Sequence, residues 1–208
     1  MAYLLIFITA IFVNNVVLSQ FLGICPFLGV SKKVDTALGM SAAVAFVLTI
    51  ATVVTYLIQD LLLEPFQLVY LQTIAFILVI AALVQMVEII LKKVSPSLYQ
   101  ALGVFLPLIT TNCCILGVAI QVAQGTYAHT GIQEATLLSG VVYALCTAIG
   151  FGLALTVFAG IREQLSLMNV PKGMQGMSIA LVTAGLLAMA FMGFSGIDNG
   201  LAQVFGLK

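Results

Sequence analysis

The chain has 208 residues, of which 62% are hydrophobic and only 7% are charged, and its formal net charge is zero. A soluble domain carries roughly 25% charged residues, so a chain this apolar cannot cover its own surface with polar groups and needs lipid around it. The balanced charge also argues against nucleic-acid binding, which requires a basic face.

Long apolar stretches predict the elements. A membrane-spanning helix needs about 20 apolar residues, and six such stretches follow one another at roughly 2–24, 36–58, 69–91, 97–122, 134–160 and 176–197. The first lacks the basic start and cleavage site of a signal peptide, so we expect it to remain as a helix. The sequence therefore predicts an all-α integral membrane protein with six transmembrane helices, forming a single transmembrane domain over residues 1–208.

The charged residues of the connections predict the orientation. The first, third and fifth connections carry the basic residues Lys32, Lys33, Lys92, Lys93, Arg162 and Lys172. The other two carry Asp60, Glu64, His129 and Glu134, with no Lys or Arg. Because basic connections stay in the cytoplasm, we expect the loops with Lys32, Lys92 and Arg162 to be cytoplasmic and both termini to lie outside. Arg162 and Glu163 are expected to anchor the fifth span at the interface or to contact another subunit.

Two segments share a short pattern. Residues 25–30 (CPFLGV) and 113–118 (CCILGV) both read C-x-x-L-G-V, and residues 73–76 (TIAF) resemble residues 178–181 (SIAL). Span one begins outside and span four inside, so two matched triplets of spans would have opposite topology, as in inverted-repeat membrane proteins. We therefore predict two inverted three-helix repeats, at approximately 1–92 and 93–197.

Cys25 and Cys113 stand in helix-breaking surroundings. Cys25 is preceded by Gly23 and followed by Pro26, which disfavours a helical conformation at Cys25. Cys113 follows Pro107 and the polar run 110–112, and polar backbone at membrane depth belongs inside protein or beside a cavity. With straight helices the two cysteines would lie near opposite faces of the membrane, so they meet only if spans one and four are broken near them. We predict these breaks, and we interpret Cys114 and Cys146 as packing residues.

A meeting of the two thiols allows three kinds of chemistry. Thiolates bind zinc or iron–sulfur clusters, and a disulfide is the third alternative. A structural zinc ion would have little to organise here. An iron–sulfur cluster normally needs four thiolates, so a second chain would supply the other two. A cluster buried in lipid would serve to pass electrons across the bilayer.

Other polar residues lie inside the predicted spans. For Asn14 and Asn15 we expect hydrogen bonds between helices. For Glu88 we expect an interfacial ion pair with Lys92, four residues further along the helix. The alternative is an ion path lined by Asn14, Asn15, Glu88 and Asn112, because polar and ionisable groups at membrane depth are candidates for function.

Four stretches resemble a known family. They are FLGICPFLGVSKK (21–33), LGVFLPLITTNC (102–113), IRE (161–163) and ALVTAGLLAMAFMGFSG (180–196). They resemble the family of A subunits of the Rnf complex, the membrane-bound ferredoxin:NAD oxidoreductase that pumps ions, and the resemblance covers about residues 3–197. The E subunit of the sodium-pumping NADH:quinone oxidoreductase is a close relative. Pro26 after the first cysteine and Thr111-Asn112 before the second favour the Rnf family.

The resemblance implies a cofactor and partners. In the family, this protein pairs with a homologous sister, the E subunit of the Rnf complex, in opposite orientation, and the two share an intramembrane 2Fe–2S cluster. By motif, Cys25 and Cys113 would be this chain's ligands, and Cys114 departs from the usual small residue. Such a cluster carries electrons between ferredoxin and NAD, coupled to Na+ or H+ translocation. The chain would then be one subunit of a translocase in a bacterial or archaeal cell (inner) membrane, with no catalytic site of its own.

Two other functions fit parts of the sequence. A secondary transporter would also have inverted repeats and broken helices. Its cysteines would be incidental, and Asn14, Glu88 and Asn112 would contact the substrate. A passive assembly subunit would need partner chains but would tolerate serine at both cysteines.

Overall fold

The computed structural model describes residues 2–63, 65, 69–94, 106–126, 136–168, 171, 173, 175–197 and 200. Every regular element in these ranges is a helix, and no strand occurs among them, which confirms the predicted all-α class. The expected starts of spans four and five, at 97 and 134, lie outside the described residues, as do Glu64, His129, Glu134 and Lys172.

The first predicted span is interrupted. Helix α1 (Ala2–Ile8) passes into a π-helical turn, η1 (Thr9–Val13), and helix resumes only at α2 (Ile24–Val30). Within the break, Phe21 and Gly23 have positive φ angles of 56° and 81°. Glycine adopts this left-handed conformation without steric cost, so Gly23 allows the chain to turn directly into α2. The predicted break is therefore present, but it ends before Cys25, which is the second residue of α2. The expectation that Pro26 keeps Cys25 out of a helix is wrong, because Pro26 falls in the first turn of α2, where its missing N–H removes no helical hydrogen bond.

A second break precedes Cys113. Helix α6 (Leu106–Thr110) ends before Thr111-Asn112, and α7 (Cys113–Ala123) begins immediately after them. The Oδ1 atom of Asn112 accepts a hydrogen bond from the backbone N–H of Cys114 at 3.0 Å. Asparagine is a favoured N-cap because its side chain satisfies an unpaired amide of the first helical turn. Both predicted breaks thus place a cysteine in the first turn of a new helix.

The remaining elements are longer helices. They are α3 (Val34–Ile58), which continues through the π-helical η2 (Gln59–Leu63); η3 (Val69–Leu71) with α4 (Gln72–Val94); α8 (Leu137–Leu167); and α9 (Met177–Met192). Three described stretches are long and apolar enough to cross a membrane, at 34–63, 72–90 and 137–167. The apolar stretches 107–123 and 177–192 are shorter. The count of six spans therefore stays a prediction.

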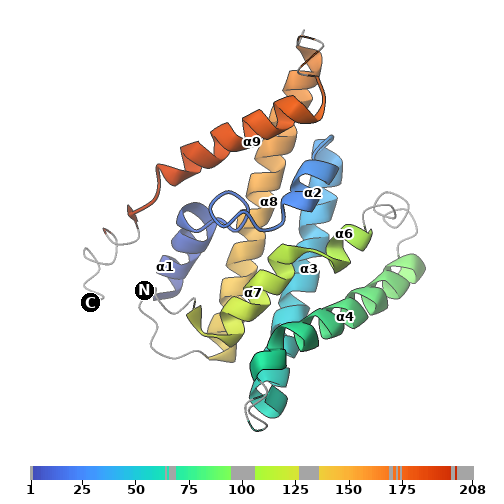
Figure 1. Ribbon diagram of the computed structural model, residues 1–208, viewed down its shortest axis with the longest axis vertical. Helices are drawn as coiled ribbons and strands as arrows, with labels where there is room; N and C mark the ends of the chain where they lie inside the picture. Colours follow the sequence, from blue (N-terminus) through green and yellow to red (C-terminus); the bar gives the residue numbers. More distant parts are fainter. Residues whose placement is uncertain are drawn as a thin grey trace.

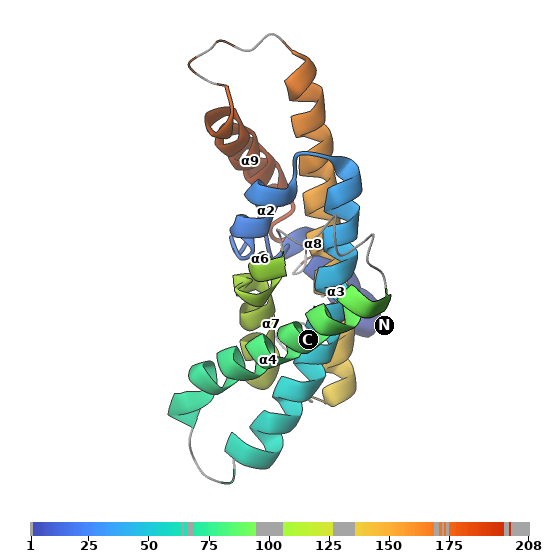
Figure 2. The same ribbon diagram turned by 90° about the vertical axis from the view of Figure 1, so that its right-hand side faces the viewer.

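Helices α3 and α8 form the centre of the molecule. They make the most extensive contact between any two elements. They run in opposite directions, α3 downward and α8 upward in Figure 1. Small residues permit this close approach, because a Cβ added to Gly152 would lie only 3.1 Å from Ser41 Cβ of α3. Helices α4 and α9 lie obliquely to this pair, as Figures 1 and 2 show.

The outer faces of the helices are apolar. Large hydrophobic side chains of α3, α4, α8 and α9 are exposed, among them Leu38, Phe46, Leu78, Ile149 and Leu181. Water would penalise so much exposed apolar surface, whereas lipid or partner helices cover it without cost. These exposed faces agree with the composition and with a multi-pass membrane protein.

Candidate functional site

The two breaks meet at one junction. The backbone N–H of Gly23 donates a hydrogen bond to Cys113 Sγ at 2.9 Å, across 90 residues of sequence. Gly23 immediately precedes α2, and Cys113 is the first residue of α7, so two helices begin here. Straight helices would have kept these segments at opposite faces of the membrane. The breaks therefore bring the segments that carry Cys25 and Cys113 together.

All four cysteines are free thiols, so the disulfide alternative is not present. Cys25 is exposed and Cys113 is half-buried. Cys114 is fully buried within the main core, and Cys146 is buried in a small cluster with Ile6. Cys114 and Cys146 thus pack as predicted, and the junction retains two thiols with some access to the surface.

The junction offers part of a metal site. No group of three or more His, Cys, Asp or Glu side chains gathers at one point within the part of the chain that the structure describes. An iron–sulfur cluster with four thiolate ligands would therefore need ligands from a second chain. The exposure of Cys25 leaves its thiol accessible to such a partner.

The junction leaves little room for a side chain at Gly23. A Cβ atom at this position would lie 3.0 Å from Phe151 Cε2 and 3.2 Å from Cys114 Cβ. The positive φ of 81° adds conformational strain to any replacement. The sequence identified Gly23 only as a helix breaker, but the structure also makes it the donor to Cys113.

Asn15 is fully buried and completely hydrogen-bonded. Its Nδ2 donates to the carbonyl oxygens of Ile11 at 3.0 Å and Gly150 at 2.9 Å. Its Oδ1 accepts from the backbone N–H groups of Val17 at 3.1 Å and Leu18 at 3.3 Å. The prediction of interhelical hydrogen bonding is confirmed for Asn15, which joins the break to α8.

The other residues of the predicted ion path are not among the hydrogen-bond partners of the Asn15 side chain. Asn14 is exposed, so the expectation that it faces protein is wrong within this chain, because the helix ends there and the backbone turns the side chain outward. Asn112 is buried at the junction, and Glu88 is half-buried on α4. No hydrogen bond between described residues joins Glu88 to the asparagines. The ion path stays a prediction.

A polar chain ties the first break to two helices, and the sequence did not single it out. Gln121 of α7 donates from Nε2 to Gln20 Oε1 at 2.9 Å. Tyr143 of α8 donates from its hydroxyl to Gln121 Oε1 at 2.8 Å. Gln20 and Gln121 lie inside predicted spans, and this alone could have indicated the chain, because amides at membrane depth usually form hydrogen bonds to neighbouring helices.

Arg162 holds the far end of α2. Its Nη1 donates to the carbonyl oxygen of Leu28 and to Ser31 Oγ, both at 2.8 Å. A cation is favourable at a helix C-terminus, where carbonyl groups lack partners. The guanidinium also lies 5.8 Å from the centroid of Phe158, whose ring stacks on Phe27 of α2. We expected Arg162 to be an interfacial anchor or to contact another subunit, and the structure shows that it also braces α2.

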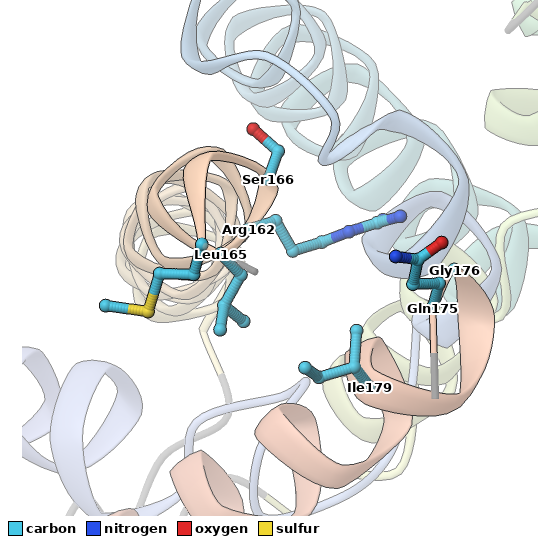
Figure 3. Close-up of a pocket in the computed structure, with 7 residues that line it drawn as sticks. Arg162, Leu165, Ser166, Gln175, Gly176 and Ile179 are labelled. Carbon is cyan, nitrogen blue, oxygen red and sulfur yellow. The ribbon is translucent and has the colours of Figure 1, made fainter. Parts of the chain in front are cut away.

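A pocket of about 370 Å³ lies beside this brace, between the end of α8 and the start of α9. Its lining residues are Arg162, Leu165, Ser166, Met168, Gln175, Gly176 and Ile179. Figure 3 shows the Arg162 side chain reaching from α8 toward Gln175 on the other side. The contact of Arg162 with Ser31 places the Lys32–Lys33 turn and the end of α8 at the same end of the molecule.

Replacing Arg162 tests whether its hydrogen bonds to Leu28 and Ser31 stabilise the chain. Arg162→Met is expected to destabilise the chain by about 1.5–3 kcal/mol, the range for hydrogen bonds to a charged group. Arg162→Lys should recover only part of this loss, because an ammonium lacks the planar fork of donors. The measurement is thermal unfolding of the solubilised protein. The exposed neighbour supplies the control, Glu163→Gln, which should change little. Equal stability of Arg162→Met and the parent protein would show that the brace is not needed.

Known proteins are similar in sequence to this chain over nearly its whole length. A family model described as "Rnf-Nqr subunit, membrane protein" matches residues 3–198. The A subunit of the Na(+)-translocating ferredoxin:NAD(+) oxidoreductase complex of Acetobacterium woodii is 60% identical over 96% of this chain and 100% of its own length. The A subunit of the ion-translocating oxidoreductase complex of Syntrophotalea carbinolica is 57% identical over 95% of this chain and 98% of its own length. The corresponding protein of Alcanivorax borkumensis is 54% identical over 94% and 97%.

Proposed function

The chain belongs to the Rnf-Nqr family of membrane-protein subunits, and from this premise we propose that it carries electrons through the membrane within an ion-translocating ferredoxin:NAD oxidoreductase complex. Relatives named as the A subunits of such complexes cover almost the entire chain. Their names favour this function over that of a secondary transporter. The chain would act as one component of the enzyme, with the ferredoxin and NAD sites on other subunits.

The contact between Gly23 and Cys113 is the observation that carries the proposal. It brings the cysteine-bearing ends of two broken helices to one place. We propose that Cys25 and Cys113 each supply one thiolate to a 2Fe–2S cluster. The homologous sister protein, the E subunit of the complex, supplies the other two. When bound there, this cluster provides one-electron transfer between the two sides of the membrane.

The residues of this chain fit the role of ligands. Cys113 is the first residue of α7, so its sulfur lies at the positive end of the helix dipole, which favours a negatively charged cluster there. The Gly23 N–H donates to the same sulfur. Cys25 is exposed, as a ligand shared with a neighbouring chain needs to be. The surrounding core excludes water, with Cys114, Ile115 and Phe151 fully buried.

The order and direction of the helices support the proposed inverted-repeat topology of the chain. Each half of the chain holds a broken segment followed by two helices, α3 and α4 in the first half and α8 and α9 in the second. The corresponding helices α3 and α8 run in opposite directions, which supports the inverted repeat. We propose that the end with Lys32 and Arg162 faces the cytoplasm, together with the Lys92 loop, and that the termini face outside.

Chemical analysis of the isolated complex tests the cofactor. Iron and acid-labile sulfide should fall by one 2Fe–2S equivalent in Cys113→Ser relative to the parent complex. Cys146→Ser is the matched control, because this cysteine is buried away from the junction in a separate cluster. Its iron content should be unchanged. Parent levels of iron and sulfide in an assembled Cys113→Ser complex would overturn the proposal.

A further inference from the structure

The junction contains a buried hydrogen-bond donor without a partner. Asn112 is 3% exposed, and its Oδ1 caps the amide of Cys114. Its Nδ2 is buried and makes no hydrogen bond with any described residue. An unpaired buried amide donor is unfavourable, so such a group needs an explanation.

This amide lies at the same junction as Cys113 Sγ. Its Oδ1 lies 3.4 Å from the point that a Gly23 Cβ would occupy, so the amide belongs to the same junction. The neighbouring backbone already directs one N–H, that of Gly23, at Cys113 Sγ. The junction therefore holds two donors near the start of α7, the Gly23 N–H, which is bonded to Cys113 Sγ, and Asn112 Nδ2, which is unpaired. The polar chain of Gln20, Gln121 and Tyr143 includes no hydrogen bond to Asn112.

We propose that Gly23 and Asn112 are positioning residues that donate hydrogen bonds to sulfur at the proposed cluster and raise its reduction potential. Gly23 donates from its backbone N–H to Cys113 Sγ, and Asn112 donates from Nδ2 to a cysteine or cluster sulfur. This inference rests on the proposed function. Hydrogen bonds to cluster sulfurs are among the factors that set the potential, because they stabilise the more negative reduced state.

The structure gives each donor a separate test. Asn112→Ser keeps a neutral N-cap acceptor for Cys114 and has no group at the position of Nδ2. Gly23→Ala places a methyl group against Phe151 and Cys114, which should move the N–H away from the sulfur. Gln124→Ala at the other end of α7 and Gly39→Ala, where a Cβ meets nothing within 4 Å, are the matched controls.

The experiment is a redox titration of the purified complex, followed by the electron paramagnetic resonance (EPR) signal that depends on Cys113. Asn112→Ser should retain this signal and shift its midpoint potential to a more negative value. Gly23→Ala should shift it in the same direction or lose the signal, while Gln124→Ala and Gly39→Ala keep the parent potential. An unchanged potential in Asn112→Ser, with the signal at full intensity, would overturn the role of Asn112. A signal that survives in Cys113→Ser would instead overturn the proposed cluster and this inference together.

Discussion

Replacing Cys25 or Cys113 by serine is expected to abolish electron transfer from ferredoxin to NAD in membranes that contain the assembled complex. A serine hydroxyl is a poor ligand for iron, and Cys25 and Cys113 are the two cysteines of the junction whose side chains are not fully buried. The assay is ferredoxin-dependent NAD reduction by membrane vesicles. Both variants should fall to the background of membranes without the complex.

The matched control is Cys146→Ser. Cys146 is buried in α8, and a serine in a helix can donate to a carbonyl of the preceding turn, so activity should stay near that of the parent. Purification through a tagged partner subunit shows whether the complex still assembles. Normal activity in both Cys25→Ser and Cys113→Ser would contradict the electron-transfer role and favour a passive assembly subunit.

Replacing Asn15 should have the largest effect on stability. Asn15→Leu removes two donated and two accepted hydrogen bonds and leaves the N–H groups of Val17 and Leu18 unpaired. We expect a loss of about 2–4 kcal/mol, since each buried unpaired group costs about 1–3 kcal/mol and the chain relaxes in part. The measurement is chemical unfolding of the solubilised protein.

Asn14→Leu is the neighbouring control for this prediction. Asn14 is exposed, and its side chain has no hydrogen bond to the described residues, so its loss should change stability little. Because Asn15 holds the break against Gly150 of α8, its replacement should also weaken the junction. Equal unfolding midpoints for Asn15→Leu and Asn14→Leu would show that the break is held by apolar packing alone.

The sequence was most informative where local chemistry decides the structure. Gly23 before Cys25 indicates the first break, and the polar run before Cys113 indicates the second, because each acts on the backbone next to it. Continuous apolar stretches likewise predicted α3 and α8 to within a few residues at their starts. These features need no knowledge of distant parts of the chain.

Local sequence patterns could not predict the contacts between residues that lie far apart in the chain. The hydrogen bond from Gly23 to Cys113 spans 90 residues, and that from Arg162 to Leu28 spans 134. The expectation of an interhelical hydrogen bond for Asn14 rested on its place inside an apolar stretch, and it is wrong because η1 ends at Val13. The oblique paths of α4 and α9 depend on packing that an apolar stretch does not encode.

The most direct test of the shared cluster is low-temperature EPR of the purified, dithionite-reduced complex. The parent complex would be compared with Cys25→Ser, Cys113→Ser and the Cys146→Ser control. We expect both junction variants to lose the same 2Fe–2S signal while the signals of the other clusters remain, and the control to keep the full spectrum. A full spectrum in Cys25→Ser and Cys113→Ser would contradict a cluster held by these two cysteines.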